Sequence, residues 1–171
     1  MITFIFGGIR SGKSKFANSL AEKYSNVSYI ATSIFYDDEM KKRIEIHRKM
    51  RPDSWKVIEE GKDLTGVLKN LSCELCIIDC FGMFVSNLLI DNLSDFDIEI
   101  KIKEFAQQIK EAKFNCIIVS NDVGGSVVSE NELARRFVDL IGFGNQILAS
   151  ISDNVFLMNA GIPQAIKSFI P

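Results

Sequence analysis

Runs of consecutive apolar residues recur along the chain and indicate its architecture. The clearest runs cover residues 2–6, 27–31, 75–80, 116–120 and 155–158. Short runs that stay apolar at nearly every position predict strands that are buried on both faces of a sheet. A shorter run, WKVIE at 55–59, predicts a peripheral strand.

Stretches typical of helices separate these runs. They cover residues 13–24, 37–50, 63–71, 81–91, 95–113 and 130–151. In the last stretch apolar residues recur close to helical spacing, which predicts one face carrying Leu133, Phe137, Leu140, Ile141, Leu148 and Ile151. Strands that alternate with helices predict an α/β fold, with a mostly parallel sheet covered on both faces. Ligands of such sheets bind beyond the carboxyl ends of the strands, so candidate site residues should directly follow the strands.

Composition narrows the class of protein. The 171 residues are 47% hydrophobic and 25% charged, which suits a single domain spanning 1–171 with a sizeable core. The formal net charge of −2 gives no electrostatic footprint for nucleic acid or an anionic membrane. No apolar stretch approaches the roughly 18 residues of a membrane span, and the N-terminus lacks the basic start of a signal peptide. We therefore expect a soluble, cytoplasmic protein with no nucleic-acid partner.

Four cysteines, Cys73, Cys76, Cys80 and Cys116, raise the question of a metal site. Cys76 and Cys80 fall in a predicted strand, where four residues separate the ends by roughly 13 Å. Ligands of one tetrahedral metal must converge far more closely, and no second C-x-x-C or nearby histidine completes a set. The cysteines are therefore interpreted as buried thiols in a reducing compartment.

The clearest motif is GGIRSGKS at Gly7–Ser14, which matches G-x-x-x-x-G-K-[ST]. It follows the strand at 2–6 and opens a predicted helix, which is the context that a phosphate-binding loop requires. Its backbone N–H groups and the helix N-terminus would hold phosphate oxygens. Lys13 would reach the outer phosphates, and the hydroxyl of Ser14 would ligate Mg²⁺. A chance match in a glycine-rich turn is the alternative, and the flanking strand and helix argue against it.

A magnesium-binding carboxylate is expected at the end of another strand. Asp79 closes the run LCIID, as in a Walker B segment, although a strand-end Asp can also cap the next helix. Asp122, in IIVSND, is a weaker candidate for the same position. The guanine-reading tetrapeptide N-K-x-D of GTPase switches does not occur, which leaves kinases, nucleotidyltransferases and ATPases.

The chain contains one histidine, His47. On a helix it shares a face with Ile44 and Arg51, and an inward histidine is often structural. Arg48, Lys49 and Arg51 surround it with cations, which disfavour a charged imidazole and would keep it a neutral nucleophile. The same cations would attract triphosphate oxygens. A solvated basic helix face remains the alternative to a catalytic role.

Several segments together resemble one family. They are GGIRSGKS at 7–14, YIATS at 29–33, DDEM..RI..HR..RP..W at 37–55, IDC....VSNLL at 78–89, VSNDVG at 119–124, LARRFVDLIGFGNQILA at 133–149 and GIP..IK at 161–167. In this order they are similar to the bifunctional adenosylcobinamide kinase/adenosylcobinamide-phosphate guanylyltransferases of cobalamin biosynthesis. A phosphate loop alone is common, whereas a phosphate loop followed by this histidine segment is specific.

The resemblance implies two reactions. ATP or GTP phosphorylates the aminopropanol hydroxyl of adenosylcobinamide, with Lys13 as a catalytic residue. A histidine, matched by His47, then attacks the α-phosphate of GTP, carries GMP as a phosphoramidate and passes it to the phosphorylated corrinoid. The resemblance also implies a RecA-like P-loop NTPase fold, Mg²⁺ held by Ser14 and Asp79, and a homotrimer.

The resemblance further implies a set of nucleotide-binding residues. They are Gly7, Gly8, Ile9, Arg10, Ser11, Gly12, Lys13, Ser14, Ala31, Thr32, Ser33, Arg48, Lys49, Met50, Arg51, Glu59 and Asp79. The chain departs from the family pattern where Ser126 and Ser129 replace the usual Gly and Pro. Asp79 also stands where Glu is often found, as a shorter carboxylate that could still serve a metal or a ribose.

Two other functions are compatible with the motifs. One is a small-molecule P-loop kinase of another pathway, in which His47 only binds phosphate. The other is a regulatory module that binds nucleotide to switch a partner, which the missing N-K-x-D disfavours. Transfer of label from α-³²P-GTP to the protein would separate the first of these from the covalent mechanism.

Overall fold

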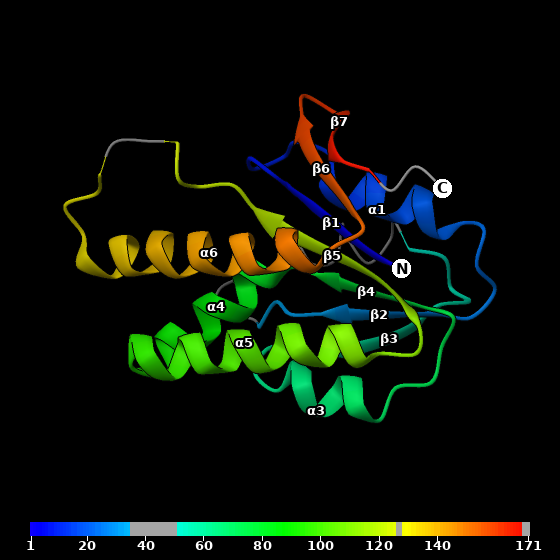
Figure 1. Ribbon diagram of the computed structural model, residues 1–171, viewed down its shortest axis with the longest axis horizontal. Coiled ribbons are helices and arrows are strands. Elements are labelled where there is room, and N and C mark those ends of the chain that lie inside the picture. The colour runs from blue at the N-terminus through cyan, green and yellow to red at the C-terminus, as the bar shows by residue number, and fades with distance from the viewer. Residues whose placement is uncertain (35–50, 126–127, 169–171) are drawn as a thin grey trace.

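A seven-stranded sheet forms the centre of the molecule in the computed structural model, which describes residues 1–34, 51–125 and 128–168 (Figure 1). Its strands are β1 (Ile2–Gly7), β2 (Val27–Ala31), β3 (Lys56–Glu59), β4 (Leu75–Asp79), β5 (Asn115–Asn121), β6 (Asn154–Asn159) and β7 (Ile162–Lys167). Their order is β3-β2-β4-β5-β1-β6-β7, and neighbours are parallel except for β6 and β7. The predicted mostly parallel sheet is therefore confirmed.

The apolar runs of the sequence became the strands at the centre of this sheet. Ile5, Ile30, Ile77, Ile78 and Ile118 are all fully buried. A strand covered on both faces must be apolar on both, which is why these segments show no alternation. The run predicted at 55–59 forms β3 at the edge of the sheet, but the strand begins at Lys56 and leaves Trp55 outside it.

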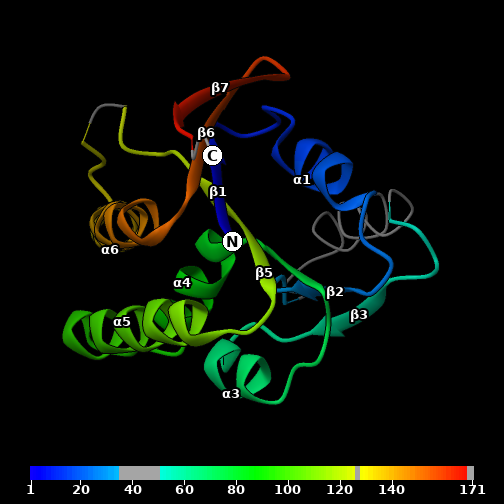
Figure 2. The same ribbon diagram turned by 45° about the vertical axis from the view of Figure 1, so that its right-hand side comes forward.

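Helices cover both faces of the sheet. They are α1 (Lys13–Ala21), α3 (Leu64–Lys69), α4 (Phe81–Ile90), α5 (Asp95–Glu111) and α6 (Glu132–Ile151). Figure 2 shows α3 to α6 on one side of the sheet and α1 on the other. The first side is packed by a cluster that includes the rings of Phe81, Phe84 and Phe105, and the second by Ala17 and Tyr29 among others.

Capping side chains explain where three of the helices begin. The side chain of Ser94 accepts from the backbone N–H of Asp97 and starts α5. The side chain of Asn131 accepts from Ala134 N–H, so α6 begins at Glu132 rather than at the predicted residue 130. Each cap satisfies a backbone donor that has no partner within the helix. Asp63 caps α3 in the same way.

Some predictions about these elements were wrong. β7 was not predicted, because all six of its residues are exposed and form no buried run. Leu133 was expected on the buried face of α6 but is 46% exposed, because it lies in the first turn of the helix. Cys80 was placed in a strand, whereas β4 ends at Asp79 and Cys80 is the N-cap of α4. The predicted helix at 37–50 lies entirely outside the described residues.

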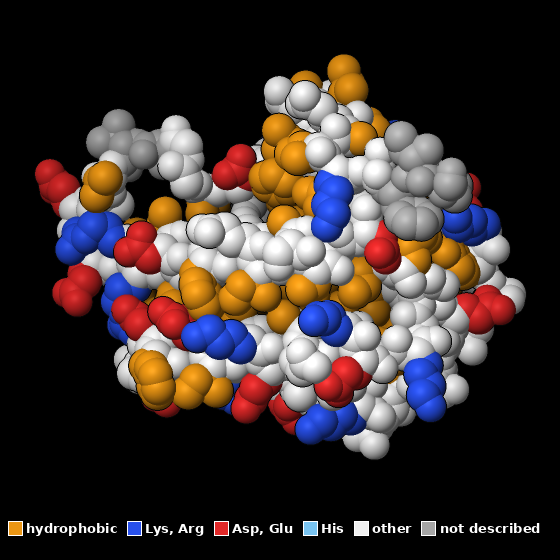
Figure 3. Space-filling view, in the orientation of Figure 1, with side chains coloured by type: hydrophobic (Ala, Val, Ile, Leu, Met, Phe, Trp, Pro, Cys, Tyr) orange, Lys and Arg blue, Asp and Glu red, His pale blue; other side chains and the backbone are white. Residues whose placement is uncertain are grey.

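The surface in Figure 3 mixes charges of both signs over α5 and α6. Apolar side chains gather between these helices and over the β6–β7 hairpin, where Ile162 and Ile166 are exposed. Within the described ranges, no helix combines the length and the apolar character needed to cross a membrane.

Candidate functional site

The phosphate-loop candidate connects β1 to α1, in the context that its motif requires. Gly7 has φ 154° and Gly12 has φ 94°, a region that residues with a Cβ rarely adopt. A Cβ on Gly7 would also collide with the carbonyl oxygen of Met158 in β6. The turn between β6 and β7 supports the loop from the same side, because Gly161 N–H donates to Ser11 O at 3.0 Å. The glycines of the motif therefore serve both backbone conformation and close packing.

Lys13, the lysine of the motif, is held against its own loop. Lys13 is only 8% exposed, and its Nζ donates to the carbonyl oxygens of Gly7 at 3.0 Å and Gly8 at 2.7 Å. Burial lowers the pKa of the Lys13 ammonium, while the nearby carboxylates of Asp79 and Asp122 act in the opposite direction. The charge of the motif lysine thus interacts with both candidate carboxylates.

The strand register brings most of the other predicted site residues to one edge. Ala31 at the end of β2 pairs with Asp79 of β4 on one side and with Glu59 of β3 on the other. Gly7 at the end of β1 pairs with Asn121 of β5, and Asp122 N–H donates to Gly7 O at 2.9 Å. Parallel strands end at the same side of a sheet, so residues far apart in sequence converge here.

Thr32 fixes the junction between β2 and α4. Its hydroxyl donates to Cys80 O at 2.7 Å and accepts from Cys80 N–H at 2.7 Å, and its backbone N–H donates to Asp79 O at 3.2 Å. Its predicted contact with nucleotide stays a prediction. What the geometry adds is that the Thr32 side chain holds Cys80, the residue that follows Asp79.

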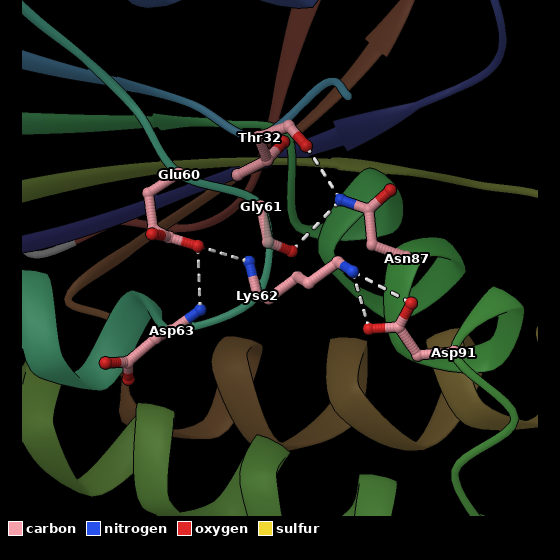
Figure 4. A network of polar contacts seen from close by, with 7 residues as sticks. All are labelled: Thr32, Glu60, Gly61, Lys62, Asp63, Asn87 and Asp91. Atoms are coloured by element: carbon pink, nitrogen blue, oxygen red, sulfur yellow. Dashed lines mark hydrogen bonds and ion pairs between the residues drawn. The ribbon is translucent and has the colours of Figure 1, made fainter. Parts of the chain in front are cut away.

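A second set of contacts joins the β3–α3 connection to α4 (Figure 4). The side-chain nitrogen of Asn87, which is fully buried, donates to Thr32 O at 2.8 Å and Gly61 O at 3.0 Å. Asn87 was not predicted as a site residue, although a buried amide in the apolar helix 81–90 must find hydrogen-bond partners. It holds together the two segments that follow β2 and β3.

Polar groups on the surface continue this network. The carboxylate of Glu60 accepts from the backbone N–H groups of Lys62 at 2.7 Å and Asp63 at 3.0 Å (Figure 4). Lys62 Nζ forms an ion pair with Asp91 at the end of α4. Exposed pairs of this kind contribute little to stability, so the buried Asn87 contacts carry most of the connection.

Tyr29 places a buried hydroxyl beside Asp79. Tyr29 is 1% exposed, and its hydroxyl donates to Asp79 Oδ2. The guanidinium carbon of Arg51 lies 3.8 Å from the centre of the Tyr29 ring, and Trp55 stacks on the same ring at 6.2 Å. Burial, followed by the charge of Asp79, raises the pKa of Tyr29 well above its ordinary value, so the phenol acts as a donor. Sequence reasoning did not name Tyr29 as a site residue, although it opens the segment YIATS and places a hydroxyl within an apolar run.

The remaining predicted residues differ in where they lie. Ile9 and Arg10 are exposed at the tip of the loop, Ser14 is half-buried in the first turn of α1, and Ser33 is half-buried after β2. His47 and residues 48–50 lie outside the described residues, so their predicted roles stay predictions.

The oxygen ligands at this edge of the sheet suit a metal ion that takes most of its ligands from water and substrate. No group of three or more His, Cys, Asp or Glu side chains forms a metal cage in the part of the chain that the structure describes. Mg²⁺ does not need one, since it is usually held by one or two carboxylates, water and substrate phosphates. Asp79 and Ser14, at the edge that carries the phosphate loop, fit that requirement. The Oγ of Ser11, buried and without a partner among the described residues, is a further donor in the same loop.

The four cysteines differ in their burial. All four are free. Cys76 and Cys116 are buried as predicted, and burial raises the pKa of Cys116 to about 12. Cys73 and Cys80 are only partly buried, because they lie beside β4 rather than within it.

Comparison with protein families matches residues 3–166 to the family described as cobinamide kinase / cobinamide phosphate guanyltransferase. The bifunctional adenosylcobalamin biosynthesis protein CobU of Escherichia coli is 36% identical, over 98% of this chain and 100% of that protein. The protein of the same name from Salmonella typhimurium is 38% identical over the same shares. CobP of Pseudomonas aeruginosa, with the same description, is 37% identical over 98% of each chain.

Comparison with solved structures supports the P-loop NTPase fold. A KaiC-like protein from the archaeon Pyrococcus horikoshii superposes with a TM-score of 0.55 at 14% identity, covering 91% of this chain and 69% of that one. An ATPase from the type III secretion system of pathogenic bacteria superposes with a TM-score of 0.56 at 9% identity, covering 96% and 56%. At these identities the likeness concerns the fold alone, and it agrees with the fold class predicted from the sequence.

Proposed function

This chain belongs to the cobinamide kinase / cobinamide phosphate guanyltransferase family, and we propose that it performs both reactions on adenosylcobinamide in cobalamin biosynthesis. In the first, ATP or GTP phosphorylates the aminopropanol hydroxyl. In the second, GMP is transferred from GTP to that phosphate, giving adenosylcobinamide-GDP. The observation that carries the proposal is the placement of Lys13 in the loop between β1 and α1, close to the Asp79 carboxylate.

The first reaction requires positioning and charge stabilisation more than covalent chemistry. The bond between the γ-phosphorus and its bridging oxygen breaks, the substrate hydroxyl oxygen bonds to that phosphorus, and the hydroxyl proton is lost. In this step Lys13 exchanges its contacts with the Gly7 and Gly8 carbonyls for phosphate oxygens. Backbone N–H groups of the loop and of the first turn of α1 bind the same phosphates.

Asp79 and Ser14 are the residues that would hold Mg²⁺, as their position at the loop edge supports. A bound Mg²⁺ neutralises charge on the phosphate oxygens and orients them. The role of the protein is to fix the carboxylate. The Tyr29 hydroxyl binds it directly, and the Thr32–Cys80 contacts hold the residue that follows it.

In the second reaction His47 is the nucleophile. A ring nitrogen bonds to the α-phosphorus of GTP while the bond to the pyrophosphate oxygen breaks, giving a histidine-GMP phosphoramidate. A phosphate oxygen of the phosphorylated corrinoid then attacks the same phosphorus and releases His47. Arg48, Lys49 and Arg51 would bind the phosphates, and Ala31–Ser33 and Glu59 would contact the nucleotide, which the family resemblance supports.

One assay tests the two reactions together. The protein is incubated with adenosylcobinamide, GTP and Mg²⁺, and products are identified by mass spectrometry. Masses of adenosylcobinamide phosphate and adenosylcobinamide-GDP are expected in that order. Replacing GTP by ATP should still give the phosphate but not the GDP product. Failure to phosphorylate adenosylcobinamide, together with turnover of another small alcohol, would favour a P-loop kinase of a different pathway.

The homotrimer and the cytoplasmic location rest on the resemblance and on composition. Analytical ultracentrifugation tests the first, with a sedimenting species of three chains as the expected result. Cell fractionation tests the second.

A further inference from the structure

Tyr29 contacts two residues that the proposed function assigns to different reactions. Its hydroxyl donates to Asp79, which lies beside the kinase lysine Lys13. The face of its ring packs against the guanidinium of Arg51, four residues after His47 in the chain. Tyr29 therefore contacts both Asp79, at the end of β4, and Arg51.

The hydrogen bond constrains the carboxylate of Asp79. A buried hydroxyl needs a partner, and at 1% exposure the Tyr29 hydroxyl has Asp79 Oδ2. Because Oδ2 accepts this bond, the plane of the carboxylate and the direction of Oδ1 are fixed as well. The Tyr29 ring cannot easily move, since it packs in the core beside Trp55, which is 8% exposed.

The contact with Arg51 constrains a cation. A planar guanidinium that lies 3.8 Å from a ring centre is bound by the electrostatic attraction of the aromatic face. Its Nε is buried and has no hydrogen-bond partner among the described residues. The Tyr29 ring is thus a direct contact of the Arg51 head group.

We propose that Tyr29 is a positioning residue for both reactions, with its hydroxyl orienting the Asp79 carboxylate and its ring face holding Arg51 at the end of the histidine segment. This rests on the proposed function and extends it to a residue with no direct part in either transfer. The two roles use different parts of one side chain, so they can be separated by substitution. Tyr29→Phe removes only the hydroxyl, and Tyr29→Leu removes the aromatic face as well.

The first experiment measures the kinase rate against Mg²⁺ concentration. In Tyr29→Phe we expect the apparent KM for Mg²⁺ to rise about tenfold, as for the loss of a partner that orients a metal ligand. At saturating Mg²⁺, labelling of the protein by α-³²P-GTP should stay within about twofold of wild type, because the ring is kept. Tyr29→Leu should also slow that labelling by at least about tenfold. Tyr24→Phe, the same change at a half-buried tyrosine beyond α1, is the matched control and should alter neither.

A double substitution separates positioning from a general structural effect. If the hydroxyl acts through Asp79, Tyr29→Phe should add nothing to the Mg²⁺ dependence of an Asp79→Ala protein, in which no side-chain oxygen is left to orient. An equal shift in both backgrounds, or an unchanged KM for Mg²⁺ in Tyr29→Phe alone, would overturn the role of the hydroxyl. Labelling of Tyr29→Leu at the wild-type rate would overturn the role of the ring.

The lone tryptophan gives a readout that does not depend on the substrate of the enzyme. Trp55 is the only tryptophan of the chain and stacks on Tyr29. Its fluorescence is titrated with Mg²⁺ in the presence of GTP, and the midpoint should shift about tenfold in Tyr29→Phe but not in Tyr24→Phe. If wild type fails to phosphorylate adenosylcobinamide while this shift is seen, the proposed function fails and the positioning role stands. If wild type phosphorylates adenosylcobinamide but the midpoint does not shift in Tyr29→Phe, the proposed function stands and the positioning role fails.

Discussion

The side-chain nitrogen of Asn87 in α4 donates a hydrogen bond to the carbonyl oxygen of Gly61 at 3.0 Å, across 26 residues of chain. The same nitrogen donates to Thr32 O. One buried amide therefore connects α4, which follows Asp79, to the ends of β2 and β3. Those ends carry the predicted nucleotide contacts Ala31–Ser33 and Glu59, so the network is expected to affect nucleotide binding as well as stability.

Gly61→Ala should disturb this connection. A Cβ at Gly61 would lie 2.8 Å from Thr32 O and would collide with the side-chain nitrogen of Asn87. We expect the free energy of unfolding to fall by about 1–3 kcal/mol, as for other overpacked sites, and the KM for nucleotide to rise. Urea denaturation and steady-state kinetics measure the two effects. Gly142→Ala, where a Cβ meets nothing within 4 Å, is the control and should leave both unchanged or slightly raise stability.

Lys13→Ala should abolish phosphorylation of adenosylcobinamide. The substitution removes the cation expected on the β and γ phosphate oxygens, and a fall of at least about 100-fold in kcat is expected from the loss of one such group. Nucleotide affinity should also weaken. Lys15→Ala, two residues later and exposed, is the matched control. Full kinase activity in Lys13→Ala would mean that this loop is not the catalytic phosphate site.

The fold was largely predictable because its central strands are buried on both faces. Ile5 and Ile78 lie in runs whose apolar character needs no tertiary information to recognise. β7 could not be found in this way, because its exposed residues are held by backbone pairing with β6 rather than by burial. Trp55 was read as part of a strand, but it precedes β3 and packs on Tyr29 instead.

The site was predictable only where one short segment carries the chemistry. The motif Gly7–Ser14 contains its own glycines, lysine and hydroxyl, so its sequence is enough to propose a role. Tyr29 and Asn87 have partners 50 and 55 residues away, Asp79 and Thr32 respectively. Contacts between residues so far apart in the chain depend on the order of the strands. That order was not predicted from the sequence, so neither residue was named as a site residue.

Asp79→Asn should weaken the Mg²⁺-dependent activity of the kinase without unfolding the protein. The amide keeps the shape of the side chain, and its oxygen can still accept from the Tyr29 hydroxyl, but the charge is lost. We expect a higher KM for Mg²⁺ and a lower kcat, measured at varied Mg²⁺. Asp122→Asn tests the other carboxylate near Lys13 and should have the smaller effect. The assignment is wrong if the rate and the Mg²⁺ dependence of Asp79→Asn equal those of wild type, or if Asp122→Asn alone changes them.

His47→Asn should separate the two reactions. A phosphoramidate requires a ring nitrogen as the nucleophile, and Asn cannot form that bond. Guanylyl transfer should therefore fall to background, and α-³²P-GTP should leave no label on the protein. The chain has no second histidine that could replace His47.

The kinase reaction should survive in the same variant. It needs Lys13, the metal and a positioned hydroxyl, none of which His47 supplies, so adenosylcobinamide phosphate should accumulate. On wild-type protein the label should resist alkali and be lost in acid, because an N–P bond is acid-labile whereas a phosphate ester of Ser is cleaved by alkali. Mass spectrometry of the labelled peptide should place GMP on His47. Label on a Lys or Ser, or normal formation of adenosylcobinamide-GDP by His47→Asn, would exclude the covalent histidine mechanism.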